Sequence, residues 1–162
     1  FIDKMKKEGF YEDTYSLYNL YRFAHYYEEA YGKYIWLKSG ASLVIEHTEA
    51  MTVIDVNTGS VLKKKKQEDT LFYQINREAA KEIARQLRLR NISGIIMIDF
   101  INMKDTAQKE KLLSLLDSEC KKDRVHCNVI DMTALNLVEM TRSKVRKPLH
   151  EQIRSCMKNN RS

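Results

Sequence analysis

The chain of 162 residues is about the length of one domain and is long enough to bury a hydrophobic core. Hydrophobic residues make up 43% and charged residues 31%, which excludes a disordered chain, and no apolar run approaches the ~20 residues of a membrane span. The net charge of +6 favours a polyanionic partner, nucleic acid first and an anionic membrane surface second. The opening residues are charged and no apolar segment follows them, so no signal peptide is expected.

Three cysteines, Cys120, Cys127 and Cys156, are odd in number and widely spaced. No Cys-x-x-Cys pair is present to indicate a zinc or redox site. We therefore expect reduced thiols and a cytoplasmic protein. The first residue is Phe1 rather than Met, and we expect a piece of a longer protein.

Residues 1–38 differ in composition from the rest, because eight of the nine tyrosines lie between Tyr11 and Tyr34. Their three- and four-residue spacing predicts one or two amphipathic helices. Aromatic rings suit stacking on RNA bases, but packing against the rest of the protein is the favoured interpretation. A short strand is expected at 34–37.

The stretch from Ala50 to Asn57 predicts a strand, since β-branched residues dominate it. Asp55 and Asn57 are two residues apart and project to the same face, just before a turn at 58–60. Residues 43–45 predict an antiparallel partner for this strand. The loop that follows, 58–70, carries four consecutive lysines, among them Lys64, which suit either solvent or phosphate contacts.

A helix is predicted from Arg77 to Arg90, with Asn76 as its N-cap. Its apolar face consists of Ala80, Ile83, Ala84 and Leu87, and a basic stripe beside it consists of Arg77, Lys81, Arg85 and Arg88. Such a stripe can line a groove or simply keep the surface soluble, and both interpretations stay open.

The apolar run 95–100 predicts a strand that is covered on both faces, with Asp99 at its carboxyl end. A second helix is predicted from Asp105, with Gln108 completing a capping box, to about Lys122, and a further strand at 125–130. Residues 135–140 are again apolar and 141–147 basic, and Pro148 is expected to end regular structure. This order predicts an α/β layered domain, a mixed sheet covered by helices.

Two aspartates at the ends of two strands can form an all-oxygen site for Mg²⁺. Asp55 and Asp99 would supply the carboxylates, and Asn57 would hold the side chain of Asp55 in place. Turn capping is the competing interpretation, since Asp-x-Asn before glycine is good turn chemistry.

Four segments together resemble the bacterial ribonuclease E/G family, in the right order and spacing over about residues 35–150. They are Gly40 to Asn57 (with Ile54-Asp55-Val56-Asn57), Glu78 to Arg90, Gly94 to Met103 (with Ile98-Asp99-Phe100) and Leu137 to Arg142. The resemblance implies that 39–147 is a DNase I-like catalytic subdomain, that 1–38 closes an RNase H-like subdomain, and that 148–162 is a polar tail.

Members of this family are endoribonucleases that cut single-stranded RNA and leave 5′-monophosphate and 3′-hydroxyl ends. The resemblance implies that Asp55 and Asp99 bind Mg²⁺, with Mn²⁺ as a possible substitute, and that Asn57 supports Asp55. Arg85, Arg88, Lys64 and Arg142 are the candidate RNA-binding residues. The expected function is a catalytic piece of such an enzyme, weakly active or inactive by itself. The alternative is a non-catalytic RNA-binding or assembly module that retains the fold.

Several departures from the family pattern stand out. Asn102 replaces a usual aspartate, Asn136 replaces a usual glycine, and Ala134 lies where a basic residue is common. The resemblance also implies an OB-type RNA-binding module and a 5′-phosphate sensor before Phe1, and oligomer formation in the complete protein. The Cys-Pro-x-Cys motif through which subunits share zinc is expected after Pro148, but Cys156-Met157 stands there, so no zinc is expected.

Overall fold

The computed structural model describes residue 19, residues 31–59 and residues 68–152. The predicted helices of the tyrosine-rich segment, Lys64 and Cys156 lie outside these residues. The chain divides into two units, Phe1–Gly32 and Lys33–Ser162, and the second contains the sheet described below. The division falls six residues before the expected boundary at residue 38, because the strand at Tyr34–Trp36 pairs into this sheet.

In the described part of the chain, six strands form one mixed sheet. They are β1 (Tyr34–Trp36), β2 (Ser42–His47), β3 (Met51–Asn57), β4 (Gly94–Asp99), β5 (Cys127–Met132) and β6 (Leu137–Arg142). Their order is β1-β2-β3-β4-β6-β5; β3 and β4 are parallel, and the other neighbours are antiparallel. The carboxyl ends of β3 and β4 therefore meet at one edge of the sheet.

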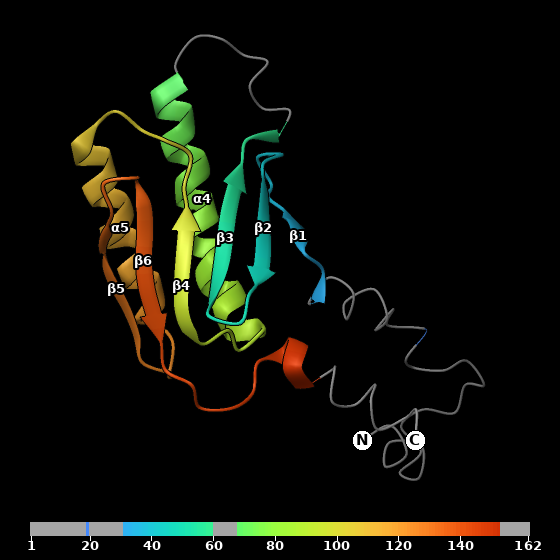
Figure 1. Cartoon of the computed structure of the whole chain (residues 1–162). Helices are drawn as coiled ribbons and strands as arrows, with labels where there is room; N and C mark the ends of the chain where they lie inside the picture. The colour runs from blue at the N-terminus through green and yellow to red at the C-terminus, as the bar shows by residue number, and fades with distance from the viewer. Residues whose placement is uncertain (1–18, 20–30, 60–67, 153–162) are drawn as a thin grey trace, which may run out of the picture. The chain divides into compact units, whose positions relative to one another are not determined.

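Helices α4 (Glu68–Leu89) and α5 (Thr106–Cys120) pack side by side on one face of the sheet (Figure 1). Alternate residues of the central strands point toward them and are buried, for example Ile54 on β3, Ile96 and Ile98 on β4, and Val138 on β6. The predicted apolar face of α4 lies in the same core, with Ala80 and Ile83 fully buried. The opposite face of the sheet carries no helix among the described residues. The prediction that the strand at 95–100 is covered on both faces is therefore wrong, and Ile95 is 49% exposed on the open face.

The prediction of a mixed sheet with covering helices is confirmed, including the antiparallel pairing of β2 with β3. The predicted free thiols at Cys120 and Cys127 are also present. No helix in the described ranges is long and apolar enough to span a membrane.

Three further local predictions are wrong. α4 begins nine residues before Arg77, so Asn76 is no N-cap but a buried residue inside the helix that binds the backbone of Ile101. Asp105 does cap α5, by accepting a hydrogen bond from the Ala107 N–H, but the side-chain oxygen of Gln108 is buried without a partner, so the capping box is not formed.

The third wrong prediction concerns Pro148. Residues 149–152 form a helical turn directly after it, and the N–H groups of Glu151 and Gln152 donate to its carbonyl oxygen. Proline suits this place because its missing N–H would have no intrahelical partner in the first turn. The Leu149 N–H donates to the Arg90 carbonyl and so ties this turn to the end of α4.

Candidate active site

Asp55 and Asp99 lie opposite each other on the two parallel strands at the centre of the sheet. Strand pairing matches Asp55 of β3 with Asp99 of β4. Neighbouring strands are about 4.8 Å apart, so the two backbones hold the carboxylates within reach of one cation. Both side chains project from the face that the helices leave open, since Ile54 and Ile98, their neighbours in sequence, point into the core.

The environment of this carboxylate pair favours a positive charge. Partial loss of solvent around the carboxylate, together with the negative charge of Asp55, raises the pKa of Asp99 above its usual value. Asn57 lies two residues along the same face and donates a hydrogen bond from its Nδ2 to Oδ2 of Asp55 at 2.7 Å. This bond fixes the orientation of the Asp55 carboxylate and leaves its other oxygen for another partner.

The turn after Asn57 depends on glycine. Gly59 has φ of +57°, and a Cβ at this position would come within 2.6 Å of the Gly40 carbonyl oxygen. Because any larger residue would push the turn away from Gly40, glycine lets the end of β3 pack closely against the connection between β1 and β2. The turn thereby holds the segment that carries Asn57.

The donor set fits Mg²⁺. Two adjacent carboxylates offer the hard oxygen ligands that this ion prefers, and Asp99 is exposed enough for water and a phosphate to complete the coordination. Glu139 of β6 lies on the same face, opposite Met97, but is displaced along the strand from Asp99. Among the described residues, no three His, Cys, Asp or Glu side chains are grouped closely enough to hold a metal ion.

Comparison with known proteins identifies the same family as the sequence motifs. The profile of the Ribonuclease E/G family matches residues 2–145. The chain belongs to this family. It is 42% identical to Ribonuclease G of Escherichia coli (strain K12) over 133 residues, which are 82% of this chain and 27% of that protein.

Other relatives of the ribonuclease E/G family cover similar parts. Ribonuclease G of Haemophilus influenzae is 42% identical over 86% of the chain, and Ribonuclease E of Nostoc sp. is 42% identical over 71%. The chain spans about a quarter of the Ribonuclease G proteins and 17% of the Nostoc protein. The relatives are therefore longer proteins, and the segment with Asp55 and Asp99 corresponds to only one part of each.

One departure from the pattern of the ribonuclease E/G family has a structural explanation. Asn136, where glycine is usual, has φ of +64° in the turn between β5 and β6. Asparagine tolerates this left-handed conformation better than most residues with a side chain. Lys109 of α5 donates a hydrogen bond from Nζ to its side-chain oxygen at 2.6 Å, so the asparagine also ties the turn to the helix.

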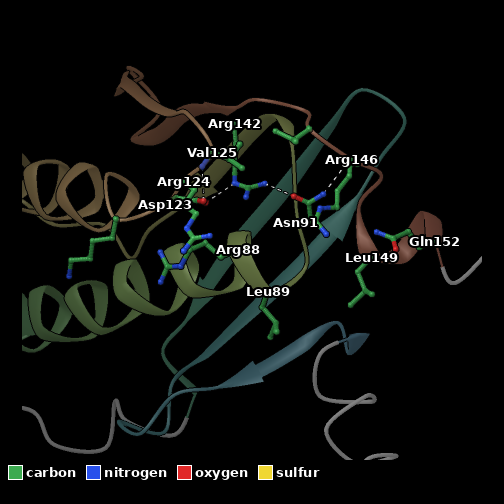
Figure 2. A pocket seen from close by; sticks show the side chains of 12 residues that line it. Arg88, Leu89, Asn91, Asp123, Arg124, Val125, Arg142, Arg146, Leu149 and Gln152 are labelled. Carbon is green, nitrogen blue, oxygen red and sulfur yellow. Dashed lines mark hydrogen bonds and ion pairs between the residues drawn. The ribbon is translucent and has the colours of Figure 1, made fainter. Parts of the chain in front are cut away.

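The predicted RNA-binding arginines do not gather around the carboxylate pair. Arg85 is exposed on α4 and is held by Glu82 through its Nε and Nη2. Arg88 and Arg142 instead line a surface pocket of about 560 Å³, together with Lys122, Arg124 and Arg146 (Figure 2). Arg142 pairs with Gly94, five residues before Asp99 on β4, which places this pocket about 17 Å from the carboxylates.

Arg142 is committed to holding the structure together. Its Nε donates to Asp123 at 2.9 Å, and its Nη1 donates to the side chain of Asn91 and the carbonyl of Ile92, as the dashed lines of Figure 2 show in part. The side chain is 3% exposed. A guanidinium that is buried and makes three such hydrogen bonds is a poor candidate for RNA binding. Arg85 is held by Glu82 on α4, away from the face that carries Asp55.

Two features of the open face were not predicted as functional. Glu139 lies in the run 135–140, to which the sequence assigns only apolar character. Trp36 is predicted only as part of a short strand, and Tyr34 also belongs to the tyrosine-rich segment, for which internal packing is favoured over base stacking. The alternation of exposed Tyr34, buried Ile35 and exposed Trp36 is the signal that identifies the two rings as members of the open face.

Proposed function

We propose that this chain is the catalytic part of a Mg²⁺-dependent endoribonuclease that hydrolyses phosphodiester bonds of single-stranded RNA and leaves 5′-phosphate and 3′-hydroxyl ends. The observation that supports it most directly is the pairing of Asp55 with Asp99 on adjacent parallel strands. Membership of the ribonuclease E/G family and the net charge of +6 favour RNA as the polyanion.

Each residue of the site has a role in this proposal. Asp55 and Asp99 would hold the ion, and Asn57 would keep the Asp55 carboxylate turned toward it. When bound, Mg²⁺ supplies a Lewis acid that offsets phosphate charge and acidifies a water. A single strand of RNA would lie across the carboxylates on the face that no helix of the described residues covers, since α4 and α5 pack on the opposite face.

The test is cleavage of single-stranded RNA by the complete protein that contains this chain. Asp55→Asn and Asp99→Asn should each lower the Mg²⁺-dependent rate by at least about 100-fold, because the stabilisation from a metal ion amounts to several kcal/mol. Glu110→Gln removes one negative charge from the exposed surface of α5 and is the matched control, with an unchanged rate. Persistent activity in both aspartate variants would exclude the proposed site.

The alternative, a non-catalytic RNA-binding or assembly module, predicts that binding survives without cleavage. The carboxylate pair argues against it, because two neighbouring negative charges repel RNA unless a cation lies between them. Metal-dependent cleavage that disappears in the aspartate variants separates the two functions.

A further inference from the structure

Two large aromatic rings stand on the same open face as the carboxylate pair. Tyr34 is 60% exposed and Trp36 is 73% exposed, while Ile35 between them is buried in the core. Both rings belong to β1, which forms one edge of the sheet next to β2. Trp36 is the chain's only tryptophan.

Strand register relates these rings to the site. Tyr34 pairs with Val44, which pairs with Asp55, so the tyrosine and both aspartates lie in one row across the sheet. In the next row Trp36 pairs with Ser42, which pairs with Asn57. Each ring is therefore two strands, or about 10 Å, from a site residue.

The residues between the rings and the site do not separate them. Val44 and Ser42 occupy the β2 positions of the two rows, and their side chains are short and at least partly buried. The surface from β1 to β3 therefore presents two flat apolar rings beside polar groups. A distance of about 10 Å corresponds to about three nucleotides at the ~3.4 Å spacing of a stacked strand, and to fewer in a stretched one.

We propose that Tyr34 and Trp36 form a stacking platform for the bases of single-stranded RNA next to the phosphodiester that Asp55 and Asp99 hold. This rests on the proposed function, because the platform gains its purpose from the neighbouring cleavage site. Every base has an aromatic face, so two rings bind RNA without a fixed sequence, and duplex RNA, whose bases are already stacked, is excluded.

The charges around the platform suit the same ligand. Lys33, directly before β1, lies over the Tyr34 ring with its Nζ 5.8 Å from the ring centroid, and it forms an ion pair with Glu46 on β2. Both side chains of this pair are about half exposed, so the pair contributes little stability and Lys33 can exchange Glu46 for a phosphate while the rings bind the bases. An apolar protein segment would gain nothing from this lysine.

The single tryptophan permits a direct test on the full 162-residue chain at low salt without divalent metal, so that no RNA is cut. Trp36 emission is followed while oligoadenylate is added, and anisotropy of the same end-labelled RNA measures binding. We expect quenching that saturates together with the anisotropy. An abasic ribose-phosphate oligomer of equal length should bind more weakly and leave Trp36 unquenched.

Substitutions at Tyr34 and Trp36 test whether these two rings are responsible for RNA binding. Trp36→Ala and Tyr34→Ala should each weaken oligoadenylate binding about tenfold, and Trp36→Phe should retain most of it because a ring remains. Ile95→Ala is the matched control: its side chain is 49% exposed on the same face, but four residues from Asp99, and binding should not change. Circular dichroism and thermal melting establish that each variant is folded.

The outcomes separate the platform from the nuclease. RNA that binds without quenching Trp36, equal quenching by the abasic oligomer, or no binding by the chain would overturn the platform. A Trp36 emission maximum typical of a buried indole before RNA is added would also overturn it, because another segment would then cover the ring. Quenching by RNA combined with undiminished cleavage in Asp99→Asn would leave the platform standing and refute the metal site alone.

Discussion

The side-chain amide of Asn76 holds the backbone of Ile101 by two hydrogen bonds. Its Nδ2 donates to the Ile101 carbonyl at 2.8 Å, and its Oδ1 accepts from the Ile101 N–H at 3.1 Å. Asn76 is fully buried within α4, and Ile101 lies two residues after Asp99. Helix α4 therefore fixes the backbone of the segment that follows β4, next to the Asp99 carboxylate.

Replacing Asn76 should lower the stability of the protein, because Asn76 holds the segment next to Asp99. Asn76→Ala leaves the N–H and the carbonyl of Ile101 without their partner, and we expect the free energy of unfolding to fall by about 2–4 kcal/mol, as urea denaturation would measure. Gln74→Ala, on the exposed side of the same helix, is the control and should change it by less than about 0.5 kcal/mol. Equal effects would mean that the two bonds contribute little.

The repulsion between Asp55 and Asp99 should be visible in the metal-free protein. Since partial desolvation and the charge of Asp55 raise the pKa of Asp99, its ionised form is disfavoured in the folded state. Asp99→Asn removes that repulsion, so the variant should melt at a higher temperature than the wild type in EDTA at pH 7.

Adding Mg²⁺ or Mn²⁺ should reverse this order. An ion that binds the folded state stabilises it by RT ln(1 + [L]/Kd), and only the wild type retains both carboxylates. The melting temperature of the wild type should therefore rise with metal concentration while that of Asp99→Asn stays constant. A parallel rise in both proteins would show that the ion binds elsewhere.

The sequence predicts the strands and the carboxylate pair because their signals are local. Alternation places Asp55 and Asn57 on one face, and the apolar run that ends in Asp99 correctly predicts a strand, although helices cover only one of its faces. The parallel pairing that brings Asp55 beside Asp99 then follows from a helix between two strands.

The failures arise where a distant contact determines the role of a residue. Asn76 has the chemistry of an N-cap, and only the fold shows that it binds Ile101, 25 residues away. Arg142 lies in a basic segment that suggests RNA contacts, yet its guanidinium donates hydrogen bonds to Asp123 and Asn91. Likewise, the relation of Trp36 to Asn57 exists only through β2, so neither spacing nor composition reveals it.

The pair formed by Asp123 and Arg142 should make stability depend on pH. Burial by itself raises the pKa of Asp123, but hydrogen bonds from the Val125 N–H and Arg142 outweigh it, so the pKa lies below its usual value. The stabilisation is then complete above the unfolded pKa of about 3.9 and is lost as the pH falls through the lower folded value.

Asp123→Ala should consequently cost about 3 kcal/mol at pH 7, because it leaves the buried guanidinium unpaired. The difference from the wild type should persist down to about pH 4 and shrink below it, as urea denaturation at several pH values would show. Asp117→Ala, which breaks a surface pair with Lys121, is the control and should cost no more than about 1 kcal/mol. A cost that does not vary with pH would contradict this role for the Asp123 carboxylate.

The turn at Asn136 offers a test of backbone strain close to the site, since the next residue, Leu137, pairs with Asp99. Asn136→Ala should lower the free energy of unfolding by about 1–2 kcal/mol, because alanine resists φ of +64° and cannot accept the bond from Lys109.

Asn136→Gly separates these two causes. Glycine adopts the same φ without strain but also loses the bond to Lys109, so it should be more stable than Asn136→Ala by about 1 kcal/mol. Leu135→Ala, at the neighbouring and largely exposed position, should have little effect in the same thermal and urea measurements. If alanine and glycine at position 136 are equally stable, the conformation of this turn imposes no strain, and the hydrogen bond from Lys109 alone accounts for the asparagine.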